Sequence, residues 1–563
     1  MQIVGAGQND LQLNGNAKKS FFKRKYKTYM NFAMQKYRVD FEGAKTLRLS
    51  EPSQMAFTIP RSGDMLMDCY LSINLPNIWS PIMPPLQSNT AAGDPTAEGG
   101  DEWAPYDFKW IENIGAKMIQ KVVISCGMET LQEYSGDYLL AATQRDFSAT
   151  KKALFDEMIG QVPELVDPAN SNARVNAYPN AFYTDDLAGP EPSIRGRTLM
   201  IPLNSWFGLN SEQAFPLCAL QYNVLKITVT FRPINELFQI RDVMDYTNRF
   251  PYVAPNFSQW YMQMQRFLHP PPNVALGIDA YQNTRVLWDT DVHLNCTYAF
   301  LGEDERYAFA TQSHKYIMKQ PRETIFYNVT GAQKVRVDSI GLVSNWLFYF
   351  RRADAKQRNT WSNYTNYPYD YQPLNVVAAP TAGTYTVYRT TASGDVVPVS
   401  IGPGVNPSGN ATGLFINQAY TPQNDKLILV CMAILLDGEY RETLQAATVY
   451  DFVEKYVRSS GNAPEGLYLY NWSMHSNLAT LEPSGAINMS KYLRIELELK
   501  TIIPPNNPSA QSLTICDPET QAVIGVNKPY WRVYDYNFDL HFFEERINWV
   551  SITSGNVGME FAN

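Results

Sequence analysis

The chain of 563 residues lacks the features that mark membrane-spanning and secreted proteins. Its longest aliphatic run, LILVCMAILL at 427–436, has ten residues between Lys426 and Asp437, well short of the ~20 that span a bilayer as a helix. The first residues, MQIVGAGQNDLQLNGNAKK, contain no apolar stretch of signal-peptide length, and their positive charges follow the apolar residues instead of preceding them. We therefore expect 427–436 to be a buried strand and secretion through a cleaved signal to be absent.

Cysteine and catalytic motifs are also scarce. The cysteines lie scattered, most of them in apolar segments and none in a C-x-x-C pair, which predicts reduced core thiols in a cytosolic protein. No G-x-S-x-G or H-E-x-x-H occurs, and the five histidines lie at least 21 positions apart, so no local pair can bind a metal ion. We expect no catalytic residue, no metal site and no cofactor.

Two short motifs were weighed as exceptions. DTDVH at 289–293 gathers ligand types, but it enters an alternating strand, on which we expect Asp291 and His293 to face solvent. GPGVNPSG at 402–409 has the glycines of a phosphate-binding loop without the Lys-Ser/Thr ending or a following helix pattern, so we interpret it as a turn.

The composition that is present indicates a β protein. Aromatic residues make up 13% of the chain, with 36 Pro and 32 Gly, and only 18% of residues are charged, against about 25% in average domains. Strict alternation of apolar and polar residues in LKITVTFR at 225–232 and YLRIELELK at 492–500 predicts half-buried antiparallel strands, with Leu225 and Leu493 on the buried faces. Two large β-sandwiches fit this length.

The sequence also predicts that the chain consists of two copies of one β-sandwich unit. KVVISCGMETLQEYSGDYL at 121–139 parallels MAILLDGEYRETLQAATVYDF at 432–452, with an apolar strand, a Gly turn and a shared Glu-Thr-Leu-Gln. Alternating strands follow each copy in the same order. We expect an N-terminal arm at 1–19, a first sandwich at 20–303, a linker at 304–313 and a second sandwich at 314–563.

One segment has a charge opposite to that of the chain. The residues up to Arg38 carry eight Lys or Arg and one Asp, so they have a net charge of +7, whereas the total is -8 and the remainder is therefore -15. Six of those positive charges lie between Lys18 and Lys27, interleaved with aromatic residues. Nucleic acid, anionic lipid, an acidic protein or plain solvent could each face such a segment.

Several stretches make the chain resemble the major capsid proteins of large eukaryotic DNA viruses, such as chlorella virus and mimivirus and their relatives. They are LQLNGNAKKSFFKRKYKTYMNF, PRSGDMLMD, FPLCALQYN, FLGEDERYAFATQSHKYIMKQ, GLYLYNWSM, EPSGAINMSK and ITSGNVGMEFAN. The resemblance implies an all-β fold of two tandem eight-stranded antiparallel jelly rolls, and a homotrimer that tiles an icosahedral shell with neighbouring capsomers. It further implies a place in the virion, assembly in the host cytoplasm, and minor capsid proteins and an inner membrane beneath the shell.

The resemblance also implies an assignment of strands B to I in the first unit. The expected strands are 37–41, 55–60, 65–75, 117–131, 197–206, 216–223, 225–232 and 292–300. In a jelly roll the BC, DE, FG and HI connections lie at one end, so we expect the loops at 76–112, 233–291, 352–425 and 501–529 to cluster there. The segment 137–196 is the exception, an expected EF connection with helices. The Tyr-rich loop within 352–425 is expected to be an exposed tower, with Asn363 and Asn410 as candidate glycan acceptors.

The basic segment would then lie at the base of the tile and face the lining of the shell. The expected docking residues are Lys18, Lys19, Phe21, Phe22, Lys23, Arg24, Lys25 and Lys27. A structural role within the trimer and nucleic-acid binding stay open, although no base-reading motif accompanies the segment and the rest of the chain would repel DNA. Two other functions also stay open: a carbohydrate-binding β-sandwich, which aromatic loops would suit, and a glycan-active enzyme, because the separation of its many carboxylates in space is unknown.

Overall fold

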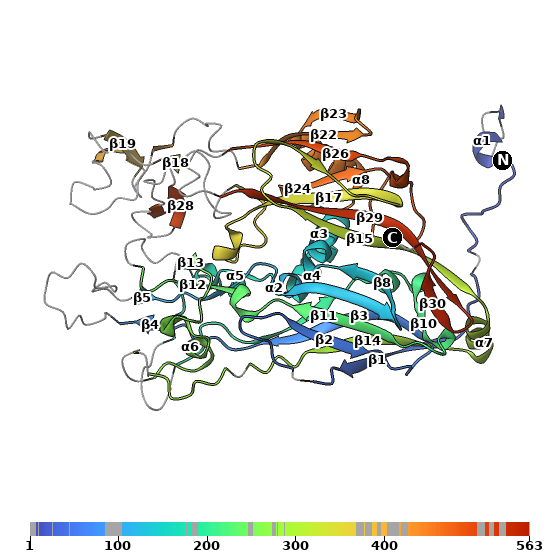
Figure 1. The fold of residues 1–563 in the computed structure, drawn as a ribbon, viewed down its shortest axis with the longest axis horizontal. Helices are drawn as coiled ribbons and strands as arrows, with labels where there is room; N and C mark the ends of the chain where they lie inside the picture. Colours follow the sequence, from blue (N-terminus) through green and yellow to red (C-terminus); the bar gives the residue numbers. More distant parts are fainter. Residues whose placement is uncertain are drawn as a thin grey trace, which may run out of the picture.

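The structure is a computed structural model. It describes residues 7–8, 11–24, 26–43, 45–84, 104–174, 177–181, 190–245, 252–272, 277, 280–286, 288–366, 376–377, 385–390, 396–401, 416–417, 426–503, 513–516, 523–527 and 536–561. Within them the chain forms two sandwiches of antiparallel strands, one above the other in Figure 1. We call the part from β1 to β14 the first unit and the part from β15 to β30 the second unit.

The first unit consists of two sheets with the strand order of a jelly roll, B-I-D-G and C-H-E-F. The first sheet runs β1 (Phe32–Asp40), β14 (His293–Leu301), β3 (Met65–Leu75) and β10 (Phe215–Pro216), and β9 (Arg197–Pro202) also pairs with β3. The second runs β2 (Ser53–Thr58), β11 (Leu225–Phe231), β7 (Ile119–Cys126) and β8 (Glu129–Tyr134).

The second unit repeats this order. One sheet runs β15 (His314–Phe326), β29 (Phe538–Thr553), β17 (Leu342–Arg352) and β24 (Leu467–Asn471), with β25 (Ile487–Asn488) and β30 (Asn556–Met559) beside it. The other runs β16 (Ala332–Arg336), β26 (Ile495–Thr501), β22 (Leu429–Leu436) and β23 (Glu439–Ala446). The double jelly roll and the internal repeat are thus confirmed, and 427–436 supplies the strand β22.

The alternation within the strands holds where the strands are regular. Leu225, Ile227 and Val229 on β11 are buried, and Lys226 between them is exposed. On β26 the buried series starts at Ile495, whereas Leu493 lies before the strand and is exposed, contrary to expectation. The short helix α7 (Glu303–Thr311) connects β14 to β15 and occupies most of the expected linker.

The assignment of strands E to G was wrong. Residues 117–131 do not form one strand, because the chain reverses at Gly127, whose φ is +63°, and continues as β8. The second unit turns likewise at Asp437 and Gly438, both with positive φ, a pair typical of two-residue hairpins. Strand F is therefore β8, residues 197–202 belong to strand G, and 137–196 is the FG connection.

The described part of the FG connection of the first unit contains the α-helices α3 (Gly136–Asp146), α4 (Ala149–Met158) and α5 (Pro163–Val166). Figure 1 shows α3 between the two units. Among the described residues, no helix has the length and hydropathy of a membrane span.

The described parts of the DE and HI loops do cluster at one end, as expected. In the first unit, β6 (Lys109–Trp110) of the DE loop pairs with β12 (Phe238–Arg241) of the HI loop. Asn359, in the DE loop of the second unit, donates through Nδ2 to the carbonyl oxygens of Asn235 and Phe238 at 2.7 and 2.8 Å. Figure 1 shows these segments at the left, whereas α7 and the start of β1 lie at the right. The motif at 402–409 lies outside the described residues.

Candidate functional site: the seam between the two units and the N-terminal arm

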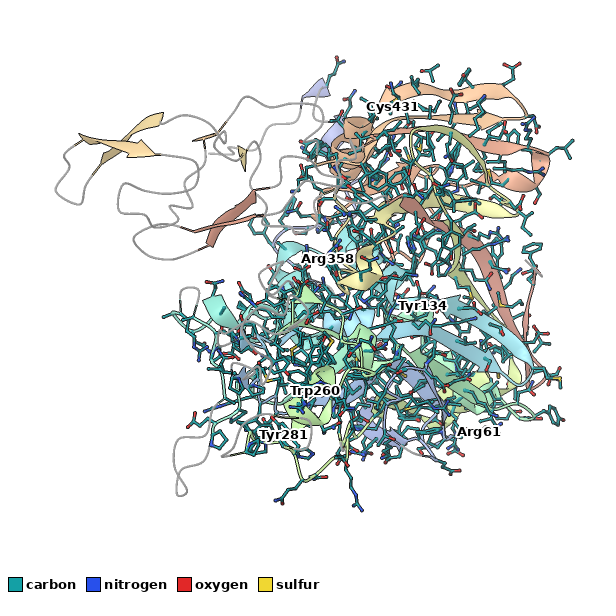
Figure 2. All side chains as sticks on the ribbon, turned by 60° about the vertical axis from the view of Figure 1, so that its left-hand side comes forward. Arg61, Tyr134, Trp260, Tyr281, Arg358 and Cys431 are labelled. Atoms are coloured by element: carbon teal, nitrogen blue, oxygen red, sulfur yellow. The ribbon has the colours of Figure 1, made fainter. Side chains whose placement is uncertain are left out.

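The two units meet along a seam that is centred on α3. The Oγ of Ser135 accepts a hydrogen bond from the backbone N–H of Tyr138 at 3.2 Å and so caps the helix. All eleven residues of α3 are buried, including the polar Asp137, Arg145 and Asp146. Figure 2 shows side chains filling the space between the units, with Tyr134 and Arg358 at their border. Because unpaired charges are costly in such a place, each of these groups needs a partner.

Arg145 finds its partners on both units. Its guanidinium donates to both carboxylate oxygens of Asp146 at 2.7 and 2.6 Å and to Oδ1 of Asn345 on β17 at 2.9 Å. It also lies 2.8 Å from Oε1 of Glu545 on β29, and Tyr138 donates its hydroxyl to the same oxygen at 2.9 Å. The helix of one unit is thereby fixed to two strands of the other.

The electrostatics of this cluster favour the ionised forms of Arg145 and Glu545, whereas burial raises the pKa of Asp146. Burial alone would raise the pKa of Glu545, but Arg145 and Lys319 outweigh it and lower that pKa to about 2. The side chains of Arg145 and Glu545 have no exposed surface. Removal of one partner would leave the other charge buried and unpaired, which lowers the free energy of unfolding by ~3–5 kcal/mol in buried pairs.

A second buried cluster surrounds Asp137. Lys117 approaches Oδ1 of Asp137 at 2.5 Å, and Arg351 and Arg232 lie 3.2 and 3.5 Å from Oδ2. Burial would raise the pKa of Asp137, yet the three cations hold it well below its ordinary value. Burial lowers the pKa of Lys117 to about 8 despite the attraction of Asp137. Arg351 belongs to the second unit, so this cluster also joins the two units.

Asp137 also comes close to two other metal-ligand types. Asp137, Glu323 and His541 each place one ligand atom within 4.8 Å of the others. However, Asp137 already contacts three cations, which would repel a metal ion. Burial and the neighbouring Arg351 lower the pKa of His541. We interpret the group as part of the seam.

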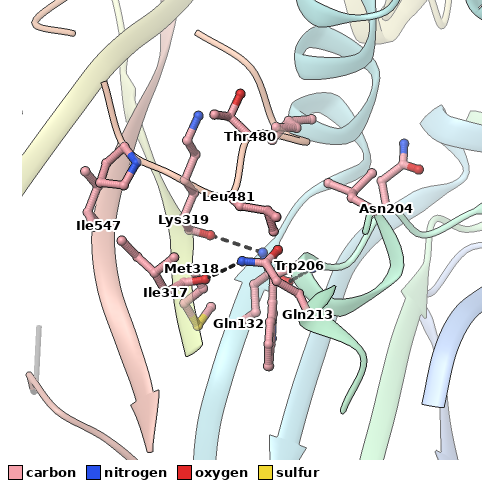
Figure 3. Close-up of a pocket in the computed structure, with 13 residues that line it drawn as sticks. Gln132, Asn204, Trp206, Gln213, Ile317, Met318, Lys319, Thr480, Leu481 and Ile547 are labelled. Atoms are coloured by element: carbon pink, nitrogen blue, oxygen red, sulfur yellow. Dashed lines mark hydrogen bonds between the residues drawn. The ribbon is translucent and has the colours of Figure 1, made fainter. Parts of the chain in front are cut away.

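A small cavity lies at the seam beside these clusters (Figure 3). Gln132 donates from Nε2 to the carbonyl oxygen of Lys319 at 3.2 Å, and Gln213 donates to that of Ile317 at 2.9 Å. The volume is about 40 Å³, enough for one to three waters and far below the ~300 Å³ of ligand pockets. The cavity offers no room for a sugar.

The N-terminal arm stands apart from the body. The described residues between Asn14 and Met30 are all exposed, and Phe22 has its whole side chain in solvent. The ring contacts in the basic segment are local, Lys19 over Phe21 and Arg24 over Tyr26. The predicted docking residues are thus neighbours along the chain, and the fold does not bring them together. Lys25 lies outside the described residues.

The structure agrees only in part with the expectation that Asp291 and His293 of the DTDVH motif face solvent. Asp291 binds Arg38 at 2.6 Å and lies 3.6 Å from Lys45, so it closes a surface ion-pair group with Asp40. Hydrogen bonding from Arg38 lowers the pKa of Asp291. His293 is buried instead of exposed, with Nδ1 2.6 Å from the carbonyl oxygen of Asp291. Arg38 therefore does not belong to the unpaired charge of the arm.

The structure describes only one of the two candidate glycan acceptors. Asn363 is only 8% exposed, and its Oδ1 accepts hydrogen bonds from the backbone N–H and the hydroxyl of Thr365 at 2.9 and 2.7 Å. This burial contradicts an exposed tower position for Asn363 and argues against a glycan there. Asn410 lies outside the described residues. The cysteines Cys69, Cys126, Cys218, Cys296 and Cys431 are free.

The buried charges of the seam were missed by the sequence reasoning. Asp137 and Arg145 lie in a segment that was expected to be helical but was not placed between the units. The available signal was the uncharged stretch YLLAATQ at 138–144, which follows Glu-Thr-Leu-Gln at 129–132 and has no charged residue for the solvated face of a helix. Only the partner strands β17 and β29 reveal its role.

Comparisons with known proteins agree with this architecture. A profile of the family described as "Major capsid protein N-terminus" matches residues 20–258. The chain is 24% identical to the major capsid protein of Phaeocystis pouchetii virus, over 100% of this chain and 99% of that protein. It is 22% identical to the major capsid protein of Paramecium bursaria Chlorella virus 1, over 88% of this chain and 86% of that protein.

Solved structures show the same fold. The Faustovirus major capsid protein superimposes with a TM-score of 0.58 at 14% identity, over 97% of this chain and 94% of that one. A chain of the PBCV-1 virus capsid gives a TM-score of 0.56 at 18% identity, over 97% of this chain and 100% of that one. The chain is thus similar, in sequence over its whole length and in its double jelly-roll fold, to the major capsid proteins of large double-stranded DNA viruses.

Proposed function

We propose that this chain is the structural protein of an icosahedral viral shell, and that three copies form a tile of near-hexagonal outline. The observation that carries the proposal is the repeat of one jelly roll within a chain, joined by a seam of buried ion pairs. Three such chains around a threefold axis present six similar sandwiches, which is what a sixfold-like tile needs. The proposed role needs no catalytic residue, and the full-length relatives, which are major capsid proteins, do not favour the carbohydrate-binding alternative.

The purified chain tests this proposal. Light scattering should give a mass of three chains, and negative-stain microscopy should show particles of hexagonal outline. A monomer or dimer at micromolar concentration, with no trimer in assembled particles, would overturn it.

We further propose that the arm docks on the inner lining of the shell, in a virion assembled in the host cytoplasm. The support is its position: the chain enters β1 at the end of the molecule opposite the DE and HI loops (Figure 1), and its basic and aromatic side chains have no partners in the described body. Positive charge with exposed rings suits an anionic surface of minor capsid proteins or lipid.

Substitution of Lys23, Arg24, Lys25 and Lys27 by Gln tests the arm. The variant should form normal trimers but lose shell assembly, and wild-type assembly should weaken as salt rises. As a matched control, Lys36→Gln changes an exposed lysine on β1 and should assemble normally. Normal assembly of the fourfold variant at physiological salt would contradict docking, and selective loss of nucleic acid from otherwise normal particles would favour genome binding instead.

A further inference from the structure

Two buried cysteines of the first unit contact each other across its central strands. Cys69 lies on β3 and Cys296 on β14, and the two residues are direct partners in the antiparallel pairing of these strands. The thiol of Cys69 donates to Sγ of Cys296 at 3.3 Å. The two residues are 4% and 0% exposed. Among the cysteines whose side chains the structure describes, only these two contact each other.

The paired strands hold the two cysteines at a spacing that suits a disulfide bond. Antiparallel partners have Cα atoms ~4.5–5.5 Å apart, and disulfides join cysteines whose Cα atoms are ~4.4–6.8 Å apart. The backbone of β3 and β14 therefore needs no rearrangement. The sulfur atoms have to approach from 3.3 Å to about 2.05 Å, which rotation about the two Cα–Cβ bonds supplies.

The second unit shows that packing does not require cysteines on these strands. Its corresponding strands, β17 and β29, pair inside the second core through large apolar residues such as Phe348 with Phe542, and both are buried. The first core instead has two small thiols in contact. The property that distinguishes a thiol pair from two apolar side chains is its chemistry, because the loss of two protons and two electrons joins the sulfur atoms covalently.

We propose that Cys69 and Cys296 are a disulfide-forming site, a pair of thiols in the newly folded chain that hydrogen peroxide converts to a disulfide in the oxidising medium outside the host cell. One sulfur attacks a peroxide oxygen and becomes a sulfenic acid, with release of one water, and the other sulfur then displaces a second water from it. The peroxide takes up both electrons, and the two thiol protons leave in the waters. The site depends only on the fold, whereas its timing rests on the proposed role in a virion.

The buried position makes this modification slow and durable. The hydrogen bond to Cys296 and burial raise the pKa of Cys69 well above its ordinary value, so little of its reactive thiolate is present at neutral pH. The pair therefore stays reduced while the chain folds in a reducing cytosol. Once formed, the disulfide is shielded from external thiols in the same way. It ties together two strands whose cysteines lie 227 positions apart, and long loops gain the most from a cross-link.

Thiol counting in the wild type tests the site without any substitution. The purified chain is treated with hydrogen peroxide or with dithiothreitol, unfolded in an alkylating reagent, and digested for mass spectrometry. Peroxide should leave two fewer thiols to alkylate and should join the peptides that contain Cys69 and Cys296. It should also raise the midpoint of thermal unfolding by ~3–8 °C. Separate sulfinic acids on the two cysteines, or two free thiols after peroxide, would overturn the proposal.

Two variants separate this bond from other oxidation. Cys69→Ala should abolish both the linked peptides and the rise of the midpoint, and a rise that persists in it would contradict the proposal. The control Cys431→Ser changes a half-buried thiol on β22 and should keep both effects. Particles collected outside the host cell should contain the linked peptides, and free thiols in them would overturn the timing. None of these measurements requires a trimer, so a monomeric chain that forms the disulfide would refute the proposed tile alone.

Discussion

The two copies of Glu-Thr-Leu-Gln occupy equivalent strands but opposite environments. Leu131 is buried between the units, whereas Leu444 is exposed. The same holds for the arginines that follow. Arg145 lies 16 residues after Glu129 and is buried in an ion-pair cluster, whereas Arg458 lies 16 residues after Glu442 and donates to the carbonyl oxygen of Met474 at 3.3 Å. The comparison teaches that the neighbour of a jelly roll, more than its own sequence, decides which of its faces is interior.

The largest expected effect on stability comes from removing Arg145, the buried one of these two arginines. Arg145→Ala leaves Glu545 and Asp146 without their shared cation, so the free energy of unfolding should fall by ~3–5 kcal/mol. Chemical denaturation of the purified chain measures it. The matched control Arg458→Ala should change stability by less than ~0.5 kcal/mol. Equal losses for the two variants would show that the seam is not the distinguishing feature.

Truncation of the two leucines sharpens the same contrast. Leu131→Ala removes a fully buried side chain and should lower the free energy of unfolding by ~2–5 kcal/mol. Leu444→Ala removes an exposed side chain and should cost under ~0.5 kcal/mol. A large loss for Leu444→Ala would mean that β23 already packs against its own chain.

The alternation of strands such as β11 and the repeat of the two units could be predicted from the sequence, because both depend on local spacing. The boundary between E and F was missed although the repeat shows a Gly turn there, because Gly127-Met128 lacks the Asp-Gly pair that marks a tight hairpin turn at the same place in the second unit. The sequence predicted an exposed position for Asn363 because the whole loop at 352–425 was taken as exposed. The first residues of this loop instead pack on the first unit. The burial of Arg145 depends on Glu545, 400 positions away, and no local pattern encodes such a pairing.

The smallest expected effect is a pH dependence that belongs to the seam alone. The pKa of Lys117 is lowered to about 8 by burial, whereas an unfolded chain has an ordinary lysine pKa near ~10.4. Between these values the unfolded chain binds a proton that the folded chain does not, so this lysine makes stability rise with pH, by ~1–3 kcal/mol. Stability curves from pH 7 to 10.5 should show that rise relative to Lys117→Met.

The exposed Lys36 of β1 provides the control for this titration. Lys36→Met should keep the rise of the wild type, because the side chain lies in solvent. If Lys117→Met and the wild type follow the same curve, Lys117 does not titrate with a lowered pKa in the seam.

Hydrogen exchange in the wild type and in the Arg145→Ala variant tests the central claim most directly. The ion pairs of Arg145 hold helix α3 at 136–146 between the two units, so its amides should be strongly protected in the wild type and exchange faster in the variant. The amides of 449–458, in the equivalent segment of the second unit, should exchange at the same rate in both proteins, because Arg145 does not contact them. Unchanged protection of 136–146 in the variant would contradict the account.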